Sequence, residues 1–517
     1  MADANIFPAL IAHCKEYGYI FPSSEIYDGL SAVYDYGQNG AQLKKNIRDY
    51  WWKSMTQLHE NIVGIDAAIF MHPTTWKASG HVDSFSDPMI DNKDSNKRYR
   101  VDHLIEGEID RLANEAFDIL EKIEQKYISE STLRGSEEFQ INVQMDPEYG
   151  NYRHLRDLAD DLNFKLEQLL AIDDFEGLKK LIENNKIKCS VSGTCNWTDI
   201  RQFNLMFSTE MGSVSEEANI IYLRPETAQG IFVNFLNVQK TSRMKIPFGI
   251  AQTGKAFRNE IVARQFIFRM REFEQMEMQF FVRPGTQMEW YNFWKAERLK
   301  WHQGIGIPAN KLRFHDHTKL AHYADAAVDI EFEFPFGWKE LEGIHSRTDY
   351  DLSRHQEFSK KKLQYFDNEI NKNYIPYVVE TSVGLDRLVL TILSLAYEEQ
   401  RWNKEDGSED SRVVLKIPAK LAPYKLAILP LVKKDGLPEI AKQLMDECKQ
   451  GFHTFYEEKD SIGKRYRRMD AIGTPLCVTI DHQTKEDNTV TIRYRDTMTQ
   501  ERIALSDVRK IVSEKIN

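Results

Sequence analysis

The residues best suited to chemistry lie in three stretches that combine arginine with carboxyl groups. The first runs from Phe268 to Val282 and is predicted to form one strand, in which side chains alternate between two faces. One face is mostly apolar. The other carries arginines, which suit phosphates, and Phe273, whose ring suits a planar base. This pattern favours a nucleotide site, and a solvated polar face on an amphipathic strand is the alternative. The polar face comprises Arg269, Arg271, Phe273, Gln275, Glu277 and Gln279.

The second stretch, GKAFRNE, lies just upstream and places Arg258 and Glu260 on one face of a predicted strand. The segment IVARQFI then joins this strand to the first stretch, as a loop long enough to close over a ligand. Residues 249–255, GIAQTGK, also fit the GxxxxGK spacing of a phosphate-binding loop. However, Ala256 stands where Ser or Thr would bind magnesium, and the sequence after it is strand-like instead of helical. We therefore reject a phosphate-binding loop.

The third stretch, VVETSVGLDRLVLTILSLAY, is predicted to be a strand followed by a helix. Glu380 and Ser382 point the same way on the strand, and Gly384 permits the turn into the helix. Arg387 falls in the first turn of that helix, where a cation opposes the helix dipole. A bound anion would explain this placement, because free N–H groups and the arginine would both hold a phosphate.

Four segments must position these residues. Charge-rich sequence with helical periodicity fills residues 92–190, and strand-like runs dominate 198–395. After a polar segment at 400–412, predicted to be a linker, short strands alternate with helices, which indicates a small α/β domain of two or three layers. The predicted domains are 1–91 (the first part of the core), 92–190 (a mostly helical insertion), 191–415 (the rest of the core) and 418–517 (a C-terminal α/β domain).

Composition excludes several classes of protein. The 517 residues are 42% hydrophobic and 28% charged, and no run of eighteen uncharged apolar residues suggests a membrane span. Five cysteines, an odd number, argue against a disulfide framework and favour a reducing compartment. The first thirty residues lack the basic start and apolar core of a signal peptide, so we expect a cytoplasmic location.

The charge is unevenly distributed along the chain. The net charge is -11, which argues against simple nonspecific binding of nucleic acid. The last hundred residues nevertheless carry 18 basic against 15 acidic side chains, whereas the remainder carries 50 against 64. A mildly basic domain beside an acidic body is consistent with an RNA-contacting appendage, and random variation between domains explains the charges equally well.

Histidines and cysteines give only weak signals for metal. His315, Asp316, His317 and His322 lack a fixed ligand spacing such as HExxH, so we do not predict a metal site there. Cys189 and Cys195 are too few and too widely spaced for a structural zinc, and we predict none.

The second and first stretches together resemble motif 2 of the class II aminoacyl-tRNA synthetases. The matching residues are Phe257, Arg258, Glu260, Arg269, Phe273 and Glu277. The third stretch resembles motif 3 of that class, whose arginine contacts the γ-phosphate of ATP. The long helix before Trp52 and the strand-like run ending at Pro73 match the more degenerate motif 1, which forms the dimer interface in the class. The resemblance therefore implies a homodimer.

Four segments resemble the dimeric glycyl-tRNA synthetases, and the resemblance extends over essentially the whole chain. They are RPETAQGIF (224–232), REFEQMEMQFF (271–281), ELEGIHSRTDYDL (340–352) and VVETSVGLDR (378–387). The resemblance implies an α+β fold, with an antiparallel sheet flanked by helices, a helical insertion and a C-terminal anticodon-binding domain. It also implies that the basic run at 463–470 approaches RNA phosphates, although a solvated surface is the alternative.

The resemblance further implies a ligase that joins glycine to tRNA(Gly) through glycyl-adenylate, with ATP and Mg²⁺ and without a membrane. It assigns catalytic roles to Arg258 and Arg387 and magnesium to Glu340 and Glu260. The implied ATP residues are Arg258, Asn259, Glu260, Phe268, Arg269, Arg271, Phe273, Glu340, Leu341, Gly384 and Arg387. The implied glycine residues are Arg100, Glu226, Gln275, Glu277, Glu380 and Ser382.

Other interpretations fit part of this pattern. Carboxylates can clamp the ammonium of glycine, and a filled pocket excludes a Cβ, so we expect no editing domain. Without the resemblance, the alternative is that the glutamates form a structural cluster or a metal site. A synthetase for threonine, proline or histidine and a non-catalytic RNA-binding relative are the competing hypotheses for the whole chain.

Overall fold

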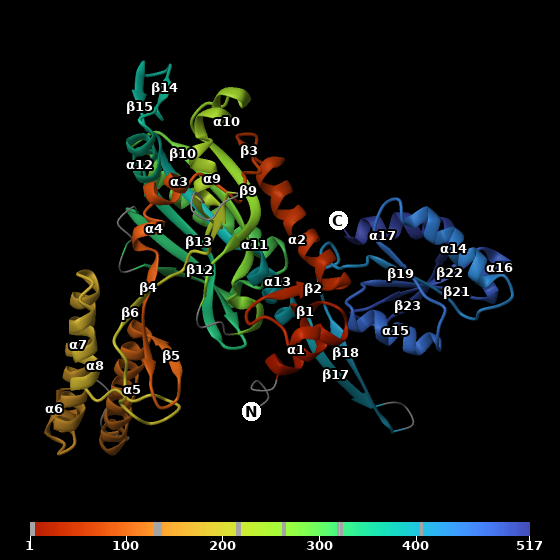
Figure 1. The fold of residues 1–517 in the computed structure, drawn as a ribbon. Coiled ribbons are helices and arrows are strands. Elements are labelled where there is room, and N and C mark those ends of the chain that lie inside the picture. Colours follow the sequence, from red (N-terminus) through yellow and green to blue (C-terminus); the bar gives the residue numbers. More distant parts are fainter. Residues whose placement is uncertain are drawn as a thin grey trace. The chain divides into compact units, whose positions relative to one another are not determined.

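A computed structural model describes residues 6–128, 137–212, 219–260, 265–317, 320, 324–403 and 407–516 (Figure 1). The chain forms two compact units. The larger contains Met1–His81 and Met206–Asn517, and the smaller contains Val82–Leu205. Each unit is considered by itself below.

A seven-stranded sheet forms the centre of the larger unit. Its strand order is β11-β12-β13-β16-β10-β9-β3, and every neighbouring pair is antiparallel except β3 with β9. The predicted α+β class with an antiparallel sheet is confirmed. The strands are β3 (Ile62–Gly64), β9 (Phe248–Phe257), β10 (Glu272–Val282), β11 (Leu312–Asp316), β12 (Ala326–Phe334), β13 (Gly337–Thr348) and β16 (Tyr377–Gly384).

Three helices supply most of the apolar cover for one face of this sheet. They are α2 (Gln38–Thr56), α11 (Gln287–Gly304) and α13 (Leu385–Ala396). Met276 and Met278 of β10 belong to the same buried cluster as Trp51 of α2, Trp294 of α11 and Leu388 of α13. Because side chains alternate along a strand, the residues between these methionines face the other side of the sheet.

The strands of the two arginine stretches are shorter than predicted. Residues Phe266–Phe268 form a 3₁₀ turn, and β10 begins only at Glu272, so Arg269 and Arg271 are not on that strand. Similarly, β9 ends at Phe257, and Arg258 follows it. The turn interrupts the polar alternation that suggested one long strand. Residues 249–255 lie within β9, which confirms that they form no phosphate-binding loop. Part of the connecting loop, 261–264, lies outside the described residues.

The remaining elements of this part lie around the sheet. They are α1 (Ile6–Glu16), β1 (Ile20–Pro22), η2 (Glu25–Tyr27), β2 (Tyr34–Tyr36), α3 (Pro73–Ala78), β7 (Ser208–Met211), β8 (Asn219–Tyr222), α9 (Ala228–Val233), α10 (Phe235–Ser242), η3 (Phe266–Phe268), η4 (Ala309–Lys311), α12 (Tyr350–Ser359), β14 (Tyr365–Asp367) and β15 (Lys372–Tyr374). The predicted linker at 400–412 is wrong for its described residues, because β17 (Tyr397–Asn403) and β18 (Glu409–Leu415) pair as an antiparallel hairpin.

The smaller unit joins helices to a short sheet. Helices α5 (Val101–Tyr127), α7 (Tyr149–Ala171) and α8 (Phe175–Asn184) share one apolar cluster with Ile90 and Trp197. The unit starts earlier and ends later than the predicted insertion, 92–190, because β4 and β6 pair with each other outside the helical sequence. Its other elements are α4 (His81–Ser84, which begins at the boundary), β4 (Ser86–Asn92), β5 (Lys97–Arg100), α6 (Glu137–Met145) and β6 (Arg201–Asn204).

The C-terminal part folds as three layers around a mixed sheet of order β20-β19-β21-β22-β23 (Figure 1). Leu426 and Ile428 of β19 pack with α14 and α17, whereas Ala427 and Leu429 pack with Met469 of α15. Both faces are therefore covered. The elements are β19 (Leu426–Pro430), α14 (Leu437–Cys448), β20 (Thr454–Tyr456), α15 (Ile462–Ala471), β21 (Leu476–Ile480), α16 (His482–Asp487), β22 (Thr489–Tyr494), β23 (Gln500–Ala504), η5 (Leu505–Asp507) and α17 (Val508–Ile516).

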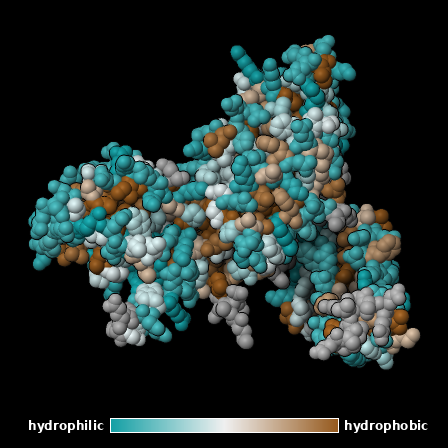
Figure 2. Space-filling view, turned by 180° about the vertical axis from the view of Figure 1, so that it is seen from behind, coloured by the Kyte–Doolittle hydropathy of each residue, from teal (hydrophilic) through white to brown (hydrophobic). Residues whose placement is uncertain are grey.

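No described helix is long and apolar enough to cross a membrane. Hydrophilic residues cover much of the face shown in Figure 2, with smaller hydrophobic patches between them.

Candidate active site

A cavity of about 310 Å³ lies on the face of the central sheet that the three helices leave open. Its lining is strongly charged and comes from β10, β13, β16, the segment after β9 and the start of α13. The lining residues are Glu226, Arg258, Glu260, Ile267, Phe268, Arg269, Met270, Phe273, Glu274, Gln275, Glu277, Glu340, Gly343, His345, Arg347, Glu380, Ser382, Gly384, Asp386 and Arg387.

Strand register brings the chemically active side chains into two adjacent rows. Directly opposite residues on neighbouring strands share a face of the sheet, so each row presents its side chains to the same side. The first row comprises Glu277, Ser382, Gly343 and Asp329, and the second comprises Gln279, Glu380, His345 and Ala327. The predicted glycine-binding residue Glu277 thus becomes a neighbour of Glu380 and Ser382, which lie about a hundred residues later in the sequence.

Glu277 lies at the centre of the acidic end of the cavity and is only 3% exposed. The hydroxyl groups of Thr227 and Ser382 donate hydrogen bonds to its two carboxyl oxygens, at 2.5 and 2.7 Å. Burial, together with the negative charges of Glu380 and Glu226, raises the pKa of Glu277 to about 7. The neutral form of this carboxyl group is therefore favoured more than in an exposed glutamate.

Glu380, in contrast, is ionised because cations surround it. Burial alone would raise its pKa, but Arg347 and His345 outweigh this effect and lower the pKa of Glu380 to about 2. Arg347 Nη1 donates to Glu380 Oε2 at 3.0 Å, His345 Nδ1 donates to Oε1 at 2.9 Å, and Gln279 donates to Oε2 at 2.6 Å. Arg347 also forms two hydrogen bonds with Asp351, so its guanidinium group is fixed in place.

Glu226 forms the third corner of the acidic end. Its carboxylate lies 3.4 Å from His81 Nε2 and accepts a hydrogen bond from Gln229 at 2.9 Å. Although burial opposes ionisation, His81 and Arg347 lower the pKa of Glu226 far below its ordinary value. Three carboxyl groups therefore face one small, buried space, and the local cations satisfy only two of them fully.

The segment that carries Glu226 is held against β9 by Arg224. The guanidinium group of Arg224 donates to the carbonyl oxygens of Lys255 and Ala67, at 2.6 and 2.8 Å. It crosses β9 at Gly254, where a Cβ atom would lie only 2.2 Å from Arg224 Nη2. A glycine is therefore required at position 254 for this arginine to reach its partners.

Arginines form the opposite end of the cavity. Arg258 Nε donates to Pro225 O at 3.1 Å, and its guanidinium carbon lies 5.4 Å from the centre of the Phe273 ring. Arg387 forms an ion pair with Glu340 at 2.9 Å and lies 4.4 Å from the centre of the Phe268 ring. Two flat cations beside two aromatic rings can bind phosphate oxygens and a planar base.

Arg387 occupies the first turn of α13, as predicted. The preceding residue, Asp386, fixes the start of this helix through hydrogen bonds to other elements. Asp386 accepts hydrogen bonds from Tyr36 and Lys44 at 2.5 and 2.6 Å, and from the backbone N–H of Glu274 at 2.7 Å. These contacts tie α13 to α2 and β10. Gly384 ends strand β16 with φ of −75°, a conformation open to any residue, so the turn does not need the flexibility of glycine.

A β-bulge explains how Glu340 reaches the cavity. The register of β12 and β13 shifts so that Leu341 has no direct partner. As a result, Leu341 and Glu342 both face the helix-covered core, where Glu342 binds Arg298 and His302 of α11. Glu340, two residues before Glu342, faces the cavity instead.

Comparison with known proteins decides the family. Three family models match, in chain order: "Glycyl-tRNA synthetase insertion domain 1" at residues 87–205, "tRNA synthetase class II core domain (G, H, P, S and T)" at 207–396 and "Anticodon binding domain" at 425–515. A glycine–tRNA ligase of Chlorobaculum tepidum is 51% identical over 98% of this chain and 99% of its own. The chain belongs to the glycyl-tRNA synthetase family.

Other relatives with the same name are similar over almost their whole length. The glycine–tRNA ligase of Treponema denticola is 45% identical over 98% of this chain and 96% of its own, and that of Staphylococcus saprophyticus is 47% identical over 98% of both. These matches confirm the sequence-based assignment of the family. They also disfavour the competing synthetases for threonine, proline and histidine.

The cavity contains most of the residues that sequence reasoning selected. Four of them do not line it. Leu341 is buried in the bulge, and Arg271 donates to the backbone of Glu260 and Ser31. Asn259 follows β9 without reaching the lining, and Arg100 belongs to the smaller unit, where it pairs with Asp87 and Asp102.

Sequence reasoning missed several lining or supporting residues. Arg347 and His345 matter most because they set the charge state of Glu380. Gly343, His345 and Arg347 lie two residues apart on β13 and so face the same side of the strand. This alternation in the segment EGIHSR is a sequence signal that could have identified them. Thr227, His81 and Asp386 carry no comparable signal, because their partners come from distant parts of the chain.

The discounted motifs have specific surroundings. His317 lies beside Asp329 and His345, whereas Asp316 pairs with Lys295, and His322 lies outside the described residues. Cys189 is buried and contacts hydroxyl groups of Ser95 and Tyr99, at 3.3 and 3.1 Å. The absence of structural zinc stays a prediction.

The basic run at 463–470 is largely engaged within the protein. Arg465 is buried and donates to the carbonyl oxygens of Pro430, Leu431 and Glu457. Arg467 pairs with Asp410, and Arg468 with Asp460. The expectation that this run presents its arginines to RNA is therefore wrong for Arg465.

Proposed function

We propose that the cavity activates glycine with ATP, giving glycyl-adenylate and pyrophosphate, and then transfers the glycyl group to the 3′-terminal adenosine of tRNA(Gly). Membership of the family and the full-length similarity to proteins named glycine–tRNA ligase support the overall reaction. The charge layout of the cavity supports the assignment of its two ends.

The acidic end suits the ammonium group of glycine. The observation that carries this assignment is geometric: Glu380 pairs with Arg347 and His345, whereas the buried carboxyl group of Glu277 accepts hydrogen bonds from Thr227 and Ser382 and forms no ion pair among the described residues. The pKa of Glu277, raised to about 7 by burial and by Glu380 and Glu226, agrees with this arrangement. A ligand ammonium placed among Glu226, Glu277 and Glu380 supplies Glu277 with a cation. Gln275, which donates to Glu277 at 3.3 Å, and Ser382 complete the proposed set. Arg100 stays in the proposal only through the family resemblance.

Size selection follows from the same contacts. Ser382, Thr227 and Gln275 all donate hydrogen bonds to Glu277, so the wall of the cavity around this carboxyl group is fixed in place. A side chain larger than hydrogen must displace part of this buried network, which costs more than the loss of a favourable contact. We therefore propose that glycine is selected without an editing site.

The arginine end suits ATP. Arg258 is proposed to stabilise negative charge on the α-phosphate while the glycine carboxylate attacks, and Arg387 to hold the γ-phosphate at the start of α13. Phe273 would stack on adenine, with Phe268 beside Arg387. The reaction needs little proton transfer in this step, so alignment and electrostatic stabilisation dominate. The further proposed ATP contacts are Glu260, Arg269, Glu340 and Gly384, which line the cavity, whereas Asn259, Arg271 and Leu341 do not line it and are not retained.

Magnesium fits the carboxylates at this end. Glu340 and Glu260 both line the cavity beside the arginines, and carboxylate oxygens are suitable ligands for Mg²⁺. The positive charge of Arg387 lowers the pKa of Glu340, so this half-exposed carboxylate is an ionised donor. A magnesium ion held there would neutralise phosphate charge. Glu340 is thereby available to both the metal and Arg387.

The remaining partners are proposed from the domains. The match of residues 425–515 to an anticodon-binding domain supports binding of tRNA. Exposed apolar residues at Ile26, Tyr27 and Leu30 support a homodimer, since such side chains gain from burial. Five free cysteines support a cytoplasmic location.

Amino-acid-dependent ATP–pyrophosphate exchange tests the proposal. We expect exchange with glycine and much weaker exchange with alanine, serine, threonine, proline and histidine. Charging of tRNA(Gly) measures the second step separately. Absence of exchange with glycine, in protein shown to be folded, would refute the proposed reaction.

A further inference from the structure

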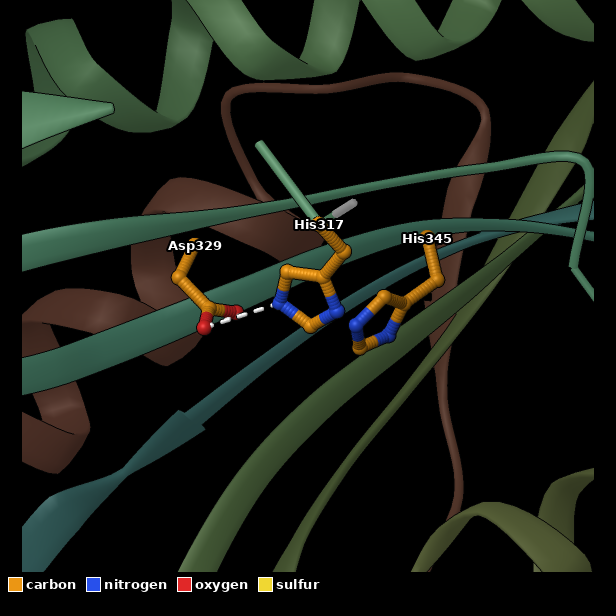
Figure 3. Close-up of side chains that lie close together, drawn as sticks. All are labelled: His317, Asp329 and His345. Atoms are coloured by element: carbon orange, nitrogen blue, oxygen red, sulfur yellow. Dashed lines mark ion pairs between the residues drawn. The ribbon is translucent and has the colours of Figure 1, made fainter. Parts of the chain in front are cut away.

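We propose that His317, Asp329 and His345 form a binding site for a divalent transition-metal ion of the zinc type, and that the bound ion fixes the position of Glu380. The site lies beside the proposed glycine pocket on the same face of the sheet. Figure 3 shows the ring of His317 between Asp329 and His345. One ligand atom from each residue lies within 4.8 Å of the others.

Strand pairing explains why the three side chains converge. His317 follows β11, and its backbone N–H donates to Ala327 O of β12 at 3.1 Å. Ala327 in turn lies opposite His345 of β13, so the two histidines flank a small residue. Asp329, two residues after Ala327, faces the same side. The three ligands therefore come from three consecutive strands.

Small residues allow these ligands to approach one another closely. Ala327 contributes only a methyl group, and Gly343, opposite Asp329, contributes no side chain. A Cβ atom on Gly343 would lie 2.9 Å from His345 Cε1, 3.4 Å from His345 Nε2 and 3.6 Å from Asp329 Oδ1. The space over Gly343 is thus bordered by one nitrogen and one oxygen that are suitable metal ligands.

The donor set favours a particular class of ion. Two imidazoles and one carboxylate suit zinc, cobalt and similar cations, whereas magnesium prefers oxygen ligands. Metal bonds of about 2.0–2.2 Å would bring closer together those ligand atoms that now lie up to 4.8 Å apart. His317 can supply this movement, because it lies beyond the last residue of β11 and its side chain is 32% exposed. Its 2.9 Å ion pair with Asp329 already holds two of the ligands together.

His345 connects the metal site to the acidic end of the cavity. Its Nδ1 donates to Glu380 Oε1 at 2.9 Å, which leaves Nε2 as the ligand nitrogen. A carboxylate that receives the second ring N–H of a ligating histidine orients the ring and is oriented by it. A metal at this site would hold Glu380 in the position that faces the ammonium of glycine. The proposed effect of the metal on Glu380, unlike metal binding itself, rests on the proposed function.

Cobalt titration of the full chain, without ATP and at about pH 8, tests the metal site through its visible absorption. We expect one Co²⁺ per wild-type chain and loss of that binding in His317→Ala and Asp329→Asn. His482→Ala is the matched control, because His482 forms a similar exposed pair with Asp435 at 3.0 Å in the C-terminal part. This control should bind Co²⁺ as the wild type does. Absence of binding in the wild type, or unchanged binding in both site variants, would overturn the proposal.

Glycine-dependent exchange with added Zn²⁺ and excess Mg²⁺ tests the connection to Glu380. We expect Zn²⁺ to lower the KM for glycine several-fold in the wild type and in His482→Ala, with little change in kcat. His317→Ala should keep its metal-free KM and show no response. An unchanged KM in wild type that has bound the metal would overturn the connection. A complete lack of exchange would refute the proposed function instead, while the cobalt titration would still decide the metal site.

Discussion

The two ends of the cavity differ in the burial of their charged groups and in the partners that hold them. At the acidic end, Glu277 and Glu380 are 3% and 4% exposed and are held by buried partners on neighbouring strands. At the arginine end, Arg258 and Arg387 follow a strand end or begin a helix, and their partners include backbone oxygens and aromatic rings. Under the proposed function, selection of the amino acid depends on a rigid buried network. Phosphate binding instead depends on cations that remain accessible.

The largest expected effect is on stability and comes from Arg347, which serves the acidic end. Arg347→Met removes the buried cation that Glu380 and Asp351 share and leaves Glu380 only His345 among its described ion-pair partners, so the free energy of unfolding should fall by about 3–5 kcal/mol. Urea denaturation followed by fluorescence measures this change. Arg313→Met is the control, because its pair with Glu331 is exposed, and it should cost less than about 1 kcal/mol. Equal stability of the two variants would contradict the buried network.

Arg258→Ala tests the arginine end and should act on the reaction instead of on folding. Loss of a group that stabilises developing charge should lower kcat for ATP–pyrophosphate exchange by about 10²–10³-fold. The free energy of unfolding should change little, because the guanidinium group is accessible. If exchange stays within a few-fold of the wild-type rate, Arg258 does not have the role proposed for it.

The pH dependence of glycine binding tests the raised pKa of Glu277. Binding of the ammonium group requires an ionised Glu277, and its pKa in the empty cavity is about 7. The KM for glycine should therefore rise about tenfold per pH unit as the pH falls below about 7. Glu277→Gln should remove this dependence while raising the KM. A wild-type KM that stays constant between about pH 8 and pH 6 would exclude the titration.

The same carboxyl group has a consequence for the ligand-free protein. Because the pKa of Glu277 in the folded state lies above that of an exposed glutamate, its contribution to stability is complete below the usual carboxyl range. This contribution is lost as the pH rises through about 7. Glu277→Gln should therefore raise the midpoint of thermal unfolding at about pH 8 and have little effect at about pH 5. A destabilised variant at pH 8 would contradict this expectation.

The smallest expected effect concerns one hydrogen bond at the acidic end. Ser382→Ala removes the 2.7 Å hydrogen bond to Glu277 and should cost about 0.5–1.5 kcal/mol, seen as a rise of about two- to tenfold in the KM for glycine. Ser346→Ala, on β13, is the control, because its buried hydroxyl has no partner among the described atoms. A KM that rises equally in both variants would mean that the hydroxyl of Ser382 plays no specific part.

Residues that follow strand or helix periodicity could be predicted from the sequence. Glu277 and Glu380 could be selected because side chains alternate between the two faces of a strand. Arg387 could be selected because a cation in the first turn of a helix opposes the helix dipole. The prediction failed where the backbone departs from its period, as at the 3₁₀ turn that removes Arg269 from β10. It also missed Arg347 and His345, whose importance comes from contact with Glu380 on another strand. Such contacts depend on register, which a single strand does not encode.

The bulge at Leu341 means that the number of residues in β13 determines where its glutamates point. On a regular strand, Glu340 and Glu342 would share one face, so either the cavity would gain two carboxylates or α11 would keep Arg298 and His302 without their full set of partners. One extra residue instead sends one acid to each side of the sheet. Deleting Leu341 while keeping every charged residue would therefore change both the cavity and the contacts with Arg298 and His302 on α11. The number of residues in β13 therefore decides which face of the sheet each glutamate occupies, just as residue identity decides which group is presented there.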